Sequence, residues 1–194
     1  LLTLLQPPRL ATPMLDLEYI VVSAAAAFAP NAPQVQFDAS PWGCGAALFI
    51  KNKPTEYFMH AWTAEDLKVL NFELGSSDGQ TTAEYTCLFA VLLVWGATSA
   101  DTGLYTAGDS MAALELSLTL KGNKILSLIS REISWQRAIF GWRYGCAHLP
   151  AEKNERADML SRWPEPGPAR RWPAELEGQT RRPMPHLRHE WACL

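Results

Sequence analysis

Four acidic residues occupy positions where a carboxylate is either costly or well placed for chemistry. Asp38 falls within an expected strand, where a buried carboxylate without a partner is unfavourable. Glu84 and Asp158 fall in the first turns of expected helices, and Asp109 falls between a strand and a helix. Strand ends and the helices that follow them meet at one edge of an α/β sheet, so the four side chains could form one site.

Each acid also has an ordinary structural explanation. Asp38 can bond the turn after its strand, and Asp109 can be a helix N-cap. Glu84 and Asp158 can favour a first helical turn because the helix dipole attracts negative charge there. Arg162 can pair with Asp158 at a spacing of four residues. These alternatives stay open for any single acid, and only the four together favour a site.

A cluster of four carboxylates needs compensating positive charge, because like charges a few ångströms apart raise one another's pKa. Hard oxygen ligands suit Mg²⁺ or Mn²⁺. Two such ions roughly 3.5 to 4 Å apart can activate a water and stabilise the leaving oxygen of a phosphodiester. The residue types therefore predict metal-assisted phosphodiester hydrolysis.

Hydrophobic periodicity predicts the elements that would position these acids. Five strands are expected, over residues 34–40, 45–51, 56–62, 104–108 and 141–147. Four helices are expected, over residues 82–98, 110–120, 125–138 and 155–162. A long acidic loop over residues 63–79 precedes the first helix. This order predicts an α/β fold, a mixed five-stranded sheet flanked by helices.

Proline marks the limits of the expected domain. Of 14 prolines, five lie in residues 1–33, six in 164–194 and only three between them. We expect the domain at 34–163, an N-terminal connector at 1–33 and a flexible Pro/Arg-rich tail at 164–194. The chain begins with Leu1, which suggests a piece of a longer polypeptide.

Composition favours a soluble, intracellular globular domain. The chain has 194 residues, of which 48% are hydrophobic and 19% charged, so it is not in the disordered class. Its four widely spaced cysteines fit neither a dense disulfide framework nor a zinc knuckle, which indicates a reducing compartment such as the cytoplasm or nucleus. The apolar run at 19–29 is too short to span a membrane.

Four segments resemble the motifs of the ribonuclease H family, most closely the domains that follow reverse transcriptase in LTR-type and related retroelements. The segments are FDASPWGCGA at 37–46, TAEY at 82–85, GDSMAA at 108–113 and HLPAEKNERADMLSR at 148–162. The last is the most specific, because it matches the H-x-P, N-x-x-A-D-x-L-S-R pattern of retroelement copies. The resemblance covers about residues 34–163.

The resemblance implies roles for five residues. Asp38, Glu84, Asp109 and Asp158 would be catalytic ligands of two Mg²⁺ ions, with Mn²⁺ as a substitute. His148 would assist proton transfer or product release. The implied reaction is hydrolysis of the RNA strand of an RNA–DNA hybrid, and the implied partner is a polymerase domain in the same polyprotein.

Further residues are candidates for contact with the hybrid. Ser40, Gly43 and Ser110 could meet the 2′-hydroxyl groups that distinguish RNA. Trp42 could stack on the hybrid or pack in the core. Asn154 matches the asparagine of the family and is also expected to cap the last helix.

Two departures from the family pattern concern substrate binding. The loop at 63–79 has no counterpart, and the break at 121–124 is too short for the basic helix with which cellular family members grip the hybrid. Residues 34–163 carry 11 Lys and Arg against 14 Asp and Glu, which predicts weak, salt-sensitive binding by the domain alone.

The sequence is compatible with three functions. The first reading is the endoribonuclease; the others are a catalytically inactive structural copy and a DNA-acting nuclease or integrase of the same fold. Trp95 and Trp135 lie on apolar helical stripes, which predicts that both are in the core.

Overall fold

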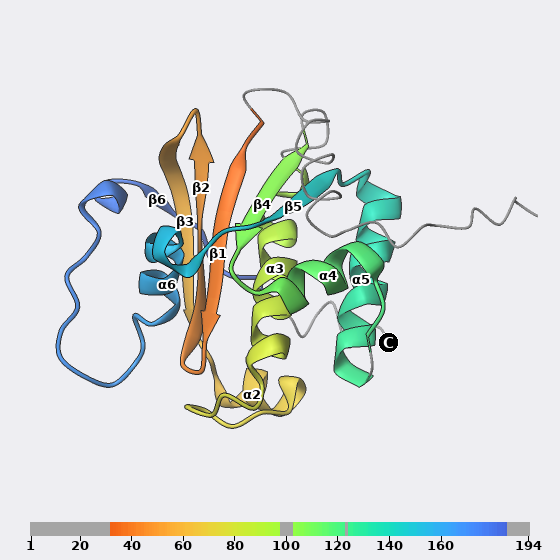
Figure 1. Cartoon of the computed structure of the whole chain (residues 1–194), viewed down its shortest axis with the longest axis horizontal. Coiled ribbons are helices and arrows are strands. Elements are labelled where there is room, and N and C mark those ends of the chain that lie inside the picture. The colour runs from red at the N-terminus through yellow and green to blue at the C-terminus, as the bar shows by residue number, and fades with distance from the viewer. Residues whose placement is uncertain (1–31, 98–102, 123, 186–194) are drawn as a thin grey trace, which may run out of the picture.

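The computed structural model describes residues 32–97, 103–122 and 124–185. Within them, six strands form one mixed sheet in the spatial order β5-β4-β1-β2-β3-β6, and five α-helices flank it (Figure 1). The predicted α/β class is confirmed, with one strand more than the five expected. The expected connector at 1–33 lies almost entirely outside the described residues.

The first three strands form an antiparallel meander. They are β1 (Gln34–Ser40), β2 (Gly43–Ile50) and β3 (Lys53–Ala61). Lys51 and Asn52 have φ values of 51° and 62°, and two successive positive φ values are typical of a type I′ hairpin turn. The alternation of buried and half-buried side chains at the start of β1 places Val35 and Phe37 in the core.

The other half of the sheet is parallel. β4 (Leu104–Gly108) pairs with β1, and β5 (Tyr144–His148) pairs with β4. Parallel neighbours need long crossover connections. These are supplied by α3 (Gln80–Trp95), α4 (Met111–Thr119) and α5 (Lys124–Phe140). Because β1, β4 and β5 run in the same direction, their carboxyl ends meet at one edge.

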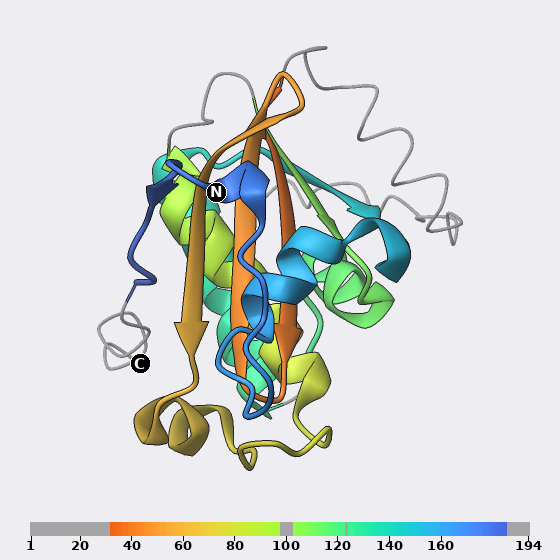
Figure 2. The same cartoon turned by 90° about the vertical axis from the view of Figure 1, so that its left-hand side faces the viewer.

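Helices cover both faces of the sheet. α3, α4 and α5 lie on one face, and α6 (Glu155–Ser161) lies on the other (Figures 1 and 2). α6 lies very close to β2, because a Cβ placed on Gly45 would be 2.3 Å from the Cβ of Leu160. Glycine at position 45 therefore lets the last helix reach the sheet edge where the acids are expected.

The segment expected as a long loop contains a short helix, α2 (Ala64–Leu70). Thr63 and Asp66 form a capping box at its start: the Thr63 side chain accepts from Asp66 N, and the Asp66 carboxylate accepts from Thr63 N at 2.9 Å. The Thr-x-x-Asp pattern was the sequence signal for this helix. Its seven residues are too few to show a clear apolar stripe.

The expectation of a flexible tail is wrong for residues 164–185. This segment contains a 3-10 helix (Ala174–Leu176) and β6 (Thr180–Arg181), which pairs with β3 in parallel. Leu176 is buried, and the Trp172 ring contacts Tyr57 at a centroid distance of 5.4 Å. Apolar anchors between the prolines hold the segment against the sheet. Residues 186–194 lie outside the described part.

The two tryptophans expected in the core differ. Trp95 is 1% exposed, and its Nε1 donates to Glu56 Oε2 at 2.7 Å. Trp135 is 61% exposed, because α5 turns Ile129 and Ile133 inward and leaves position 135 on the opposite side. The prediction for Trp135 is therefore wrong.

Across the described residues, no helix has both the length and the apolarity needed to cross a membrane.

Candidate active site

Three of the four expected acids meet at the carboxyl edge of the parallel strands. Asp38 lies in β1, Glu84 in the second turn of α3, and Asp109 directly after β4; one carboxylate oxygen from each lies within 4.8 Å of the others. Gln36 of β1 pairs with Ala107 of β4, so continuing this register by two residues places Asp38 beside Asp109. The sheet itself brings these two acids together.

Helix α3 adds the third carboxylate through Gln80. The Gln80 side-chain amide donates to the Ala39 carbonyl at 2.6 Å and to Glu84 Oε1 at 2.8 Å. One amide therefore ties α3 to β1 and fixes one oxygen of Glu84. The other oxygen, Oε2, is buried and has no hydrogen-bond partner.

Burial makes the negative charge of this cluster costly. Asp38 and Glu84 are each 4% exposed. Burial raises the pKa of Asp38 to about 7; Asp109 and Asp158 add to the rise, and a hydrogen bond from Ser161 opposes it. Burial also raises the pKa of Glu84 to about 9, with the charge of Asp38 adding to it. A divalent cation would remove this cost.

The donor set fits a hard divalent ion. Three carboxylates converge, and one of their buried oxygens lacks any partner. Unpartnered carboxylate oxygens at this spacing are ligands that Mg²⁺ or Mn²⁺ prefers. Asp38, Glu84 and Asp109 could therefore hold such an ion. Among the described residues, this is the one group of three or more potential ligands that lie close enough together.

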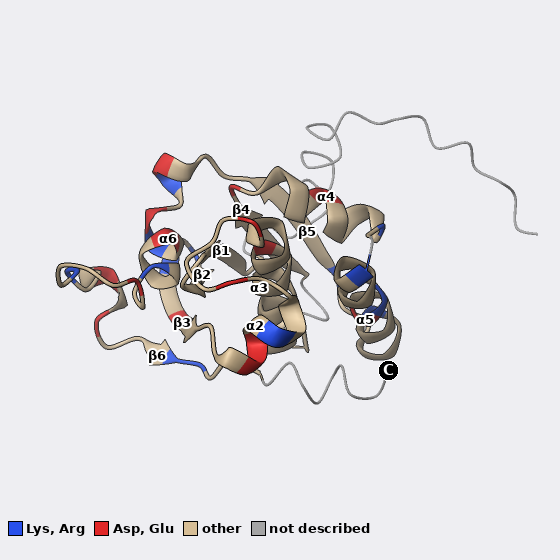
Figure 3. Ribbon diagram, turned by 90° about the horizontal axis from the view of Figure 1, so that it is seen from below, with Lys and Arg blue, Asp and Glu red and all other residues tan. Residues whose placement is uncertain are grey.

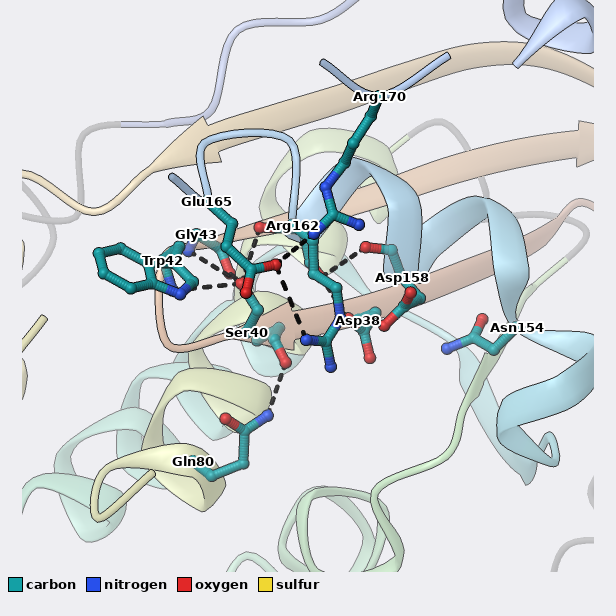
Figure 4. A network of polar contacts seen from close by, with 12 residues as sticks. Asp38, Ser40, Trp42, Gly43, Gln80, Asn154, Asp158, Arg162, Glu165 and Arg170 are labelled. Carbon is teal, nitrogen blue, oxygen red and sulfur yellow. Dashed lines mark hydrogen bonds and ion pairs between the residues drawn. The ribbon is translucent and has the colours of Figure 1, made fainter. Parts of the chain in front are cut away.

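The fourth acid, Asp158, lies beside Asp38 but is not one of the three carboxylates that converge. It sits in the first turn of α6, and its Oδ1 accepts from Arg162 Nε at 2.5 Å. Its side chain is 44% exposed, yet it is near enough to raise the pKa of Asp38. The ion pair considered as an alternative for Asp158 is thus formed, and Asp158 still borders the site (Figure 4).

His148 lies at the same edge of the sheet. It is the last residue of β5, is exposed, and pairs with Gly108, the residue before Asp109. The Leu149 N–H then donates to the Gly108 carbonyl at 2.8 Å, which holds the two strand ends together. His148 is therefore an exposed residue at the sheet edge where Asp38 and Asp109 lie.

Ser40 and Gly43 are buried parts of the turn after β1. The Ser40 hydroxyl accepts from Trp42 N and Gly43 N, each at 3.2 Å, and donates to the Ser161 carbonyl at 2.8 Å. A Cβ on Gly43 would lie 2.3 Å from the His60 carbonyl oxygen. Because both residues are enclosed in this way, they shape the turn, and their expected contact with the hybrid is not supported.

Asn154 is fully buried and is the N-cap residue of α6, as expected, but its side chain makes no capping hydrogen bond. Its amide instead donates to the Phe37 carbonyl at 2.9 Å, across 117 positions of sequence. This bond fixes the start of α6 to β1, one residue before Asp38. The Asn154 side chain positions α6 and is too deeply buried to reach a substrate from here.

Ser110 and Trp42 are more accessible. Ser110 is the N-cap of α4, where its side chain accepts from Ala113 N at 3.4 Å, and it is half-buried. Trp42 is also half-buried, and its ring lies 3.0 Å from where a Cβ of Gly75 would be. Trp42 thus packs partly on the loop before α3 and is partly exposed, so it is neither a fully buried core residue nor a fully exposed one.

Two residues of the site, Gln80 and Ser161, were not identified from the sequence, and Arg162 was identified only as a possible partner of Asp158. Gln80 lies four residues before Glu84, a spacing that allows a side-chain hydrogen bond on a helix. Ser161 and Arg162 both lie in the motif at 148–162, whose spacing indicated the pair of Arg162 with Asp158 but no contact of Ser161 with Asp38. Their positions depend on how closely α6 packs on β1 and β2.

Charge is distributed unevenly around the site. Figure 3 shows acidic positions near β4 and α3 at the carboxylate edge, and basic positions on α5 at some distance from them. The network drawn in Figure 4 adds two arginines, Arg162 and Arg170, which flank Glu165. Positive charge close to the site therefore comes from α6 and the segment that follows it.

Comparison with known proteins gives a likeness to solved structures alone. No family model and no curated protein matches the chain. The chain is similar to LC11-RNase H1 in complex with an RNA/DNA hybrid (16% identity, 66% of this chain and 91% of that chain, TM-score 0.45).

Two further solved structures are similar at a comparable level. RNase H1 from the halophilic archaeon Halobacterium salinarum NRC-1 is 18% identical over 68% of this chain and 94% of that chain, with a TM-score of 0.49. A foamy viral protease-reverse transcriptase in complex with double-stranded DNA is 16% identical over 66% of this chain and 24% of that chain, with a TM-score of 0.40.

Proposed function

We propose that this chain contains an endoribonuclease domain that hydrolyses the RNA strand of RNA–DNA hybrids with divalent metal ions. The observation that carries the proposal is the convergence of the half-buried Asp109 with the buried Asp38 and Glu84, with Glu84 Oε2 left without a partner. A structural role does not need three carboxylates at one point, because burying them together is unfavourable.

We assign the four acids to two metal ions. Asp38, Glu84 and Asp109 would hold the first ion, and Asp158, together with Asp38, would contribute to the second. Mg²⁺ ions here would lower the pKa of an attacking water and stabilise the leaving oxygen of the phosphodiester. Gln80 fixes Glu84 for this purpose, and Ser161 fixes Asp38.

The exposed His148 would move protons at the edge of the site. An imidazole can accept or donate a proton near neutral pH. Because His148 is held beside Gly108 only by backbone pairing, its side chain can turn towards a bound substrate. Its replacement by alanine should slow turnover and leave binding of the metal ions unchanged.

The choice of substrate and biological context rests on the motif resemblance. The segment at 148–162 matches the retroelement pattern, so we assign the domain to a reverse transcriptase polyprotein with a polymerase domain as its neighbour. The net charge of −3 gives the domain little general attraction for nucleic acid, and neighbouring domains would supply affinity.

The experiment compares labelled RNA–DNA hybrid, RNA duplex and DNA duplex, each incubated with the purified chain in Mg²⁺ and in EDTA. We expect Mg²⁺-dependent cleavage of RNA in the hybrid alone. Asp109→Asn should reduce the rate at least about 100-fold, while Asp78→Asn, at an exposed acid outside the site, should retain it.

The other outcomes identify the alternatives. Cleavage of DNA duplex would indicate a DNA-acting nuclease or integrase. No cleavage of any substrate by the folded chain, over a range of Mg²⁺ and Mn²⁺ concentrations, would indicate an inactive structural copy. Either result would overturn the proposal.

A further inference from the structure

The last turn of α6 reaches back into the carboxylate cluster through Ser161. This residue is fully buried, and its hydroxyl donates to Asp38 Oδ2. Its backbone carbonyl accepts from Ser40 at 2.8 Å. The side chain and the backbone of Ser161 are thus both hydrogen-bonded to β1. These two bonds fix the end of α6 and therefore the position of the next residue.

The next residue, Arg162, places a guanidinium between carboxylates. Its Nε donates to Asp158 Oδ1 at 2.5 Å, and its Nη1 lies 4.0 Å from Glu165 Oε2. Figure 4 shows the guanidinium directed towards Asp38, and its charge is near enough to stabilise the ionised form of that carboxylate. Arg162 therefore supplies positive charge to both Asp38 and Asp158.

The same pair of carboxylates is where a second divalent ion would have to bind. Figure 4 shows the Asp158 side chain beside that of Asp38, and the charge of Asp158 raises the pKa of Asp38. Asp158 therefore borders the cluster through Asp38. An ion that uses Asp158 must share Asp38, and the positive charge now nearest to both is the Arg162 guanidinium.

We propose that Arg162 is a built-in counter-cation that holds Asp158 beside Asp38 and must be displaced when a second divalent ion binds. This inference rests on the proposed function. Glu165 would receive the displaced guanidinium, since its carboxylate already lies 4.0 Å from Nη1. Glu165 is itself paired with Arg170, so the receiving position is held in place by a second arginine.

The proposal predicts that Arg162 competes with the second ion and leaves the first unaffected. Both partners of the Arg162–Asp158 pair are about two-fifths exposed, so the competition is moderate. In Arg162→Gln we expect the Kd of the second ion to fall about three- to tenfold, with the Kd of the first ion unchanged. Arg162→Lys should resemble the wild type because it keeps the charge.

The test is isothermal titration calorimetry of the whole chain with Mn²⁺, with no nucleic acid present. Arg156→Gln is the matched control, because Arg156 lies on the same helix and pairs with Glu175 rather than with the site. Thermal unfolding provides a second readout: Arg162→Gln should melt lower than the wild type in EDTA and gain more from added Mn²⁺.

Several results would overturn the inference. It fails if Arg162→Gln binds the second ion no more tightly than the wild type. It also fails if the Kd of the first ion changes by the same factor as the Kd of the second. If Arg162→Gln does not fold, Glu165→Gln is the test. Glu165→Gln and the double variant Arg162→Lys/Glu165→Gln should both bind the second ion more weakly than the wild type. Unchanged binding of the second ion in these variants would contradict the proposal.

Failure of this inference is distinguishable from failure of the proposed function. If the wild type cleaves the hybrid but Arg162 variants bind Mn²⁺ as the wild type does, only the role of Arg162 is wrong. If the wild type neither binds Mn²⁺ nor cleaves the hybrid, both are wrong.

Discussion

Glu84 shows how a residue can be unfavourable for stability and necessary for function. It is 4% exposed, and one of its oxygens has no hydrogen-bond partner. Its carboxylate is held against Asp38 by Gln80, where like charges repel. A buried charge with this cost is retained when a bound cation compensates it, which is the role we propose.

Replacing Glu84 should stabilise the protein when metal is absent. Because the folded-state pKa is raised from 4.5 to about 9, the carboxyl stabilises the fold fully below about pH 4.5, and this contribution is lost as the pH rises through about 9. Glu84→Gln should therefore raise the free energy of unfolding in EDTA by about 1 to 3 kcal/mol at pH 8, and by less at pH 5.

Urea unfolding at both pH values measures this effect. Glu152→Gln, at an exposed position, is the control and should change little at either pH. A Glu84→Gln protein that is less stable than the wild type at pH 8 would show that the carboxylate is well compensated without metal, contrary to the account.

In the capping box of α2, removing a carboxylate should destabilise the protein, in contrast to the replacement of Glu84. Burial of Asp66 acts to raise its pKa, but hydrogen bonds from His60 and Thr63 outweigh this and lower the pKa to about 2. His60 Nε2 lies 2.7 Å from Asp66 Oδ2. The pair joins α2 to β3 ahead of the helix that carries Glu84.

Asp66→Asn should lower the free energy of unfolding by about 1 to 2 kcal/mol at pH 7. Because the pKa of Asp66 is lowered in the folded state, its carboxylate stabilises the fold above about pH 3.8, and this stabilisation is lost as the pH falls through about 2. Thermal unfolding between pH 2 and 7 checks this, with the exposed Asp78→Asn for comparison. Equal stability of Asp66→Asn and wild type at pH 7 would refute it.

Most of the elements could be predicted from sequence because their patterns are local. β1 and β4 have the expected bounds, since alternating or continuous apolar runs and flanking turn residues define them. α2 was missed because its seven residues show no clear apolar stripe. β6 was missed because it has two residues and is held by contacts distant in sequence, such as Arg182 N–H to the Tyr57 carbonyl at 2.7 Å. Composition alone cannot reveal such contacts.

The candidate site was predictable to the extent that its residues follow from strand register. Asp38 and Asp109 come together because β1 and β4 are parallel neighbours. The sequence could not decide between the two roles of Asp158, because its pairing with Arg162 and its place beside Asp38 both depend on how α6 packs on the sheet. Asn154 likewise satisfied a capping pattern but donates to Phe37, since α6 packs unusually close to the sheet.

At the scale of the whole molecule, residues 164–185 act as a strap across the outer edge of the sheet. Leu176 packs with Ala47, Phe49 and Leu160 on the α6 face. Met184 packs with the core on the other face, and its sulfur lies 3.6 Å from Cys44 Sγ. The strap therefore covers the β3 edge, which would otherwise present unpaired backbone groups.

Leu176→Ala should lower the free energy of unfolding by about 2 to 3 kcal/mol, because it removes a fully buried side chain from a small apolar cluster. Leu74→Ala, at a position that is 48% exposed, should have little effect. Urea denaturation of both variants measures the difference. If the two behave alike, the strap does not pack on the domain as described.

The proposed chemistry requires that Asp38, Glu84 and Asp109 form one site for a divalent ion. A crystal structure of the whole chain soaked in Mn²⁺, with anomalous diffraction recorded at the manganese edge, tests this most directly. We expect an anomalous peak in contact with all three carboxylates, and we expect this peak to be lost in Asp109→Asn. A chain that cleaves hybrid while Mn²⁺ binds elsewhere, or with no peak among these carboxylates, would contradict it.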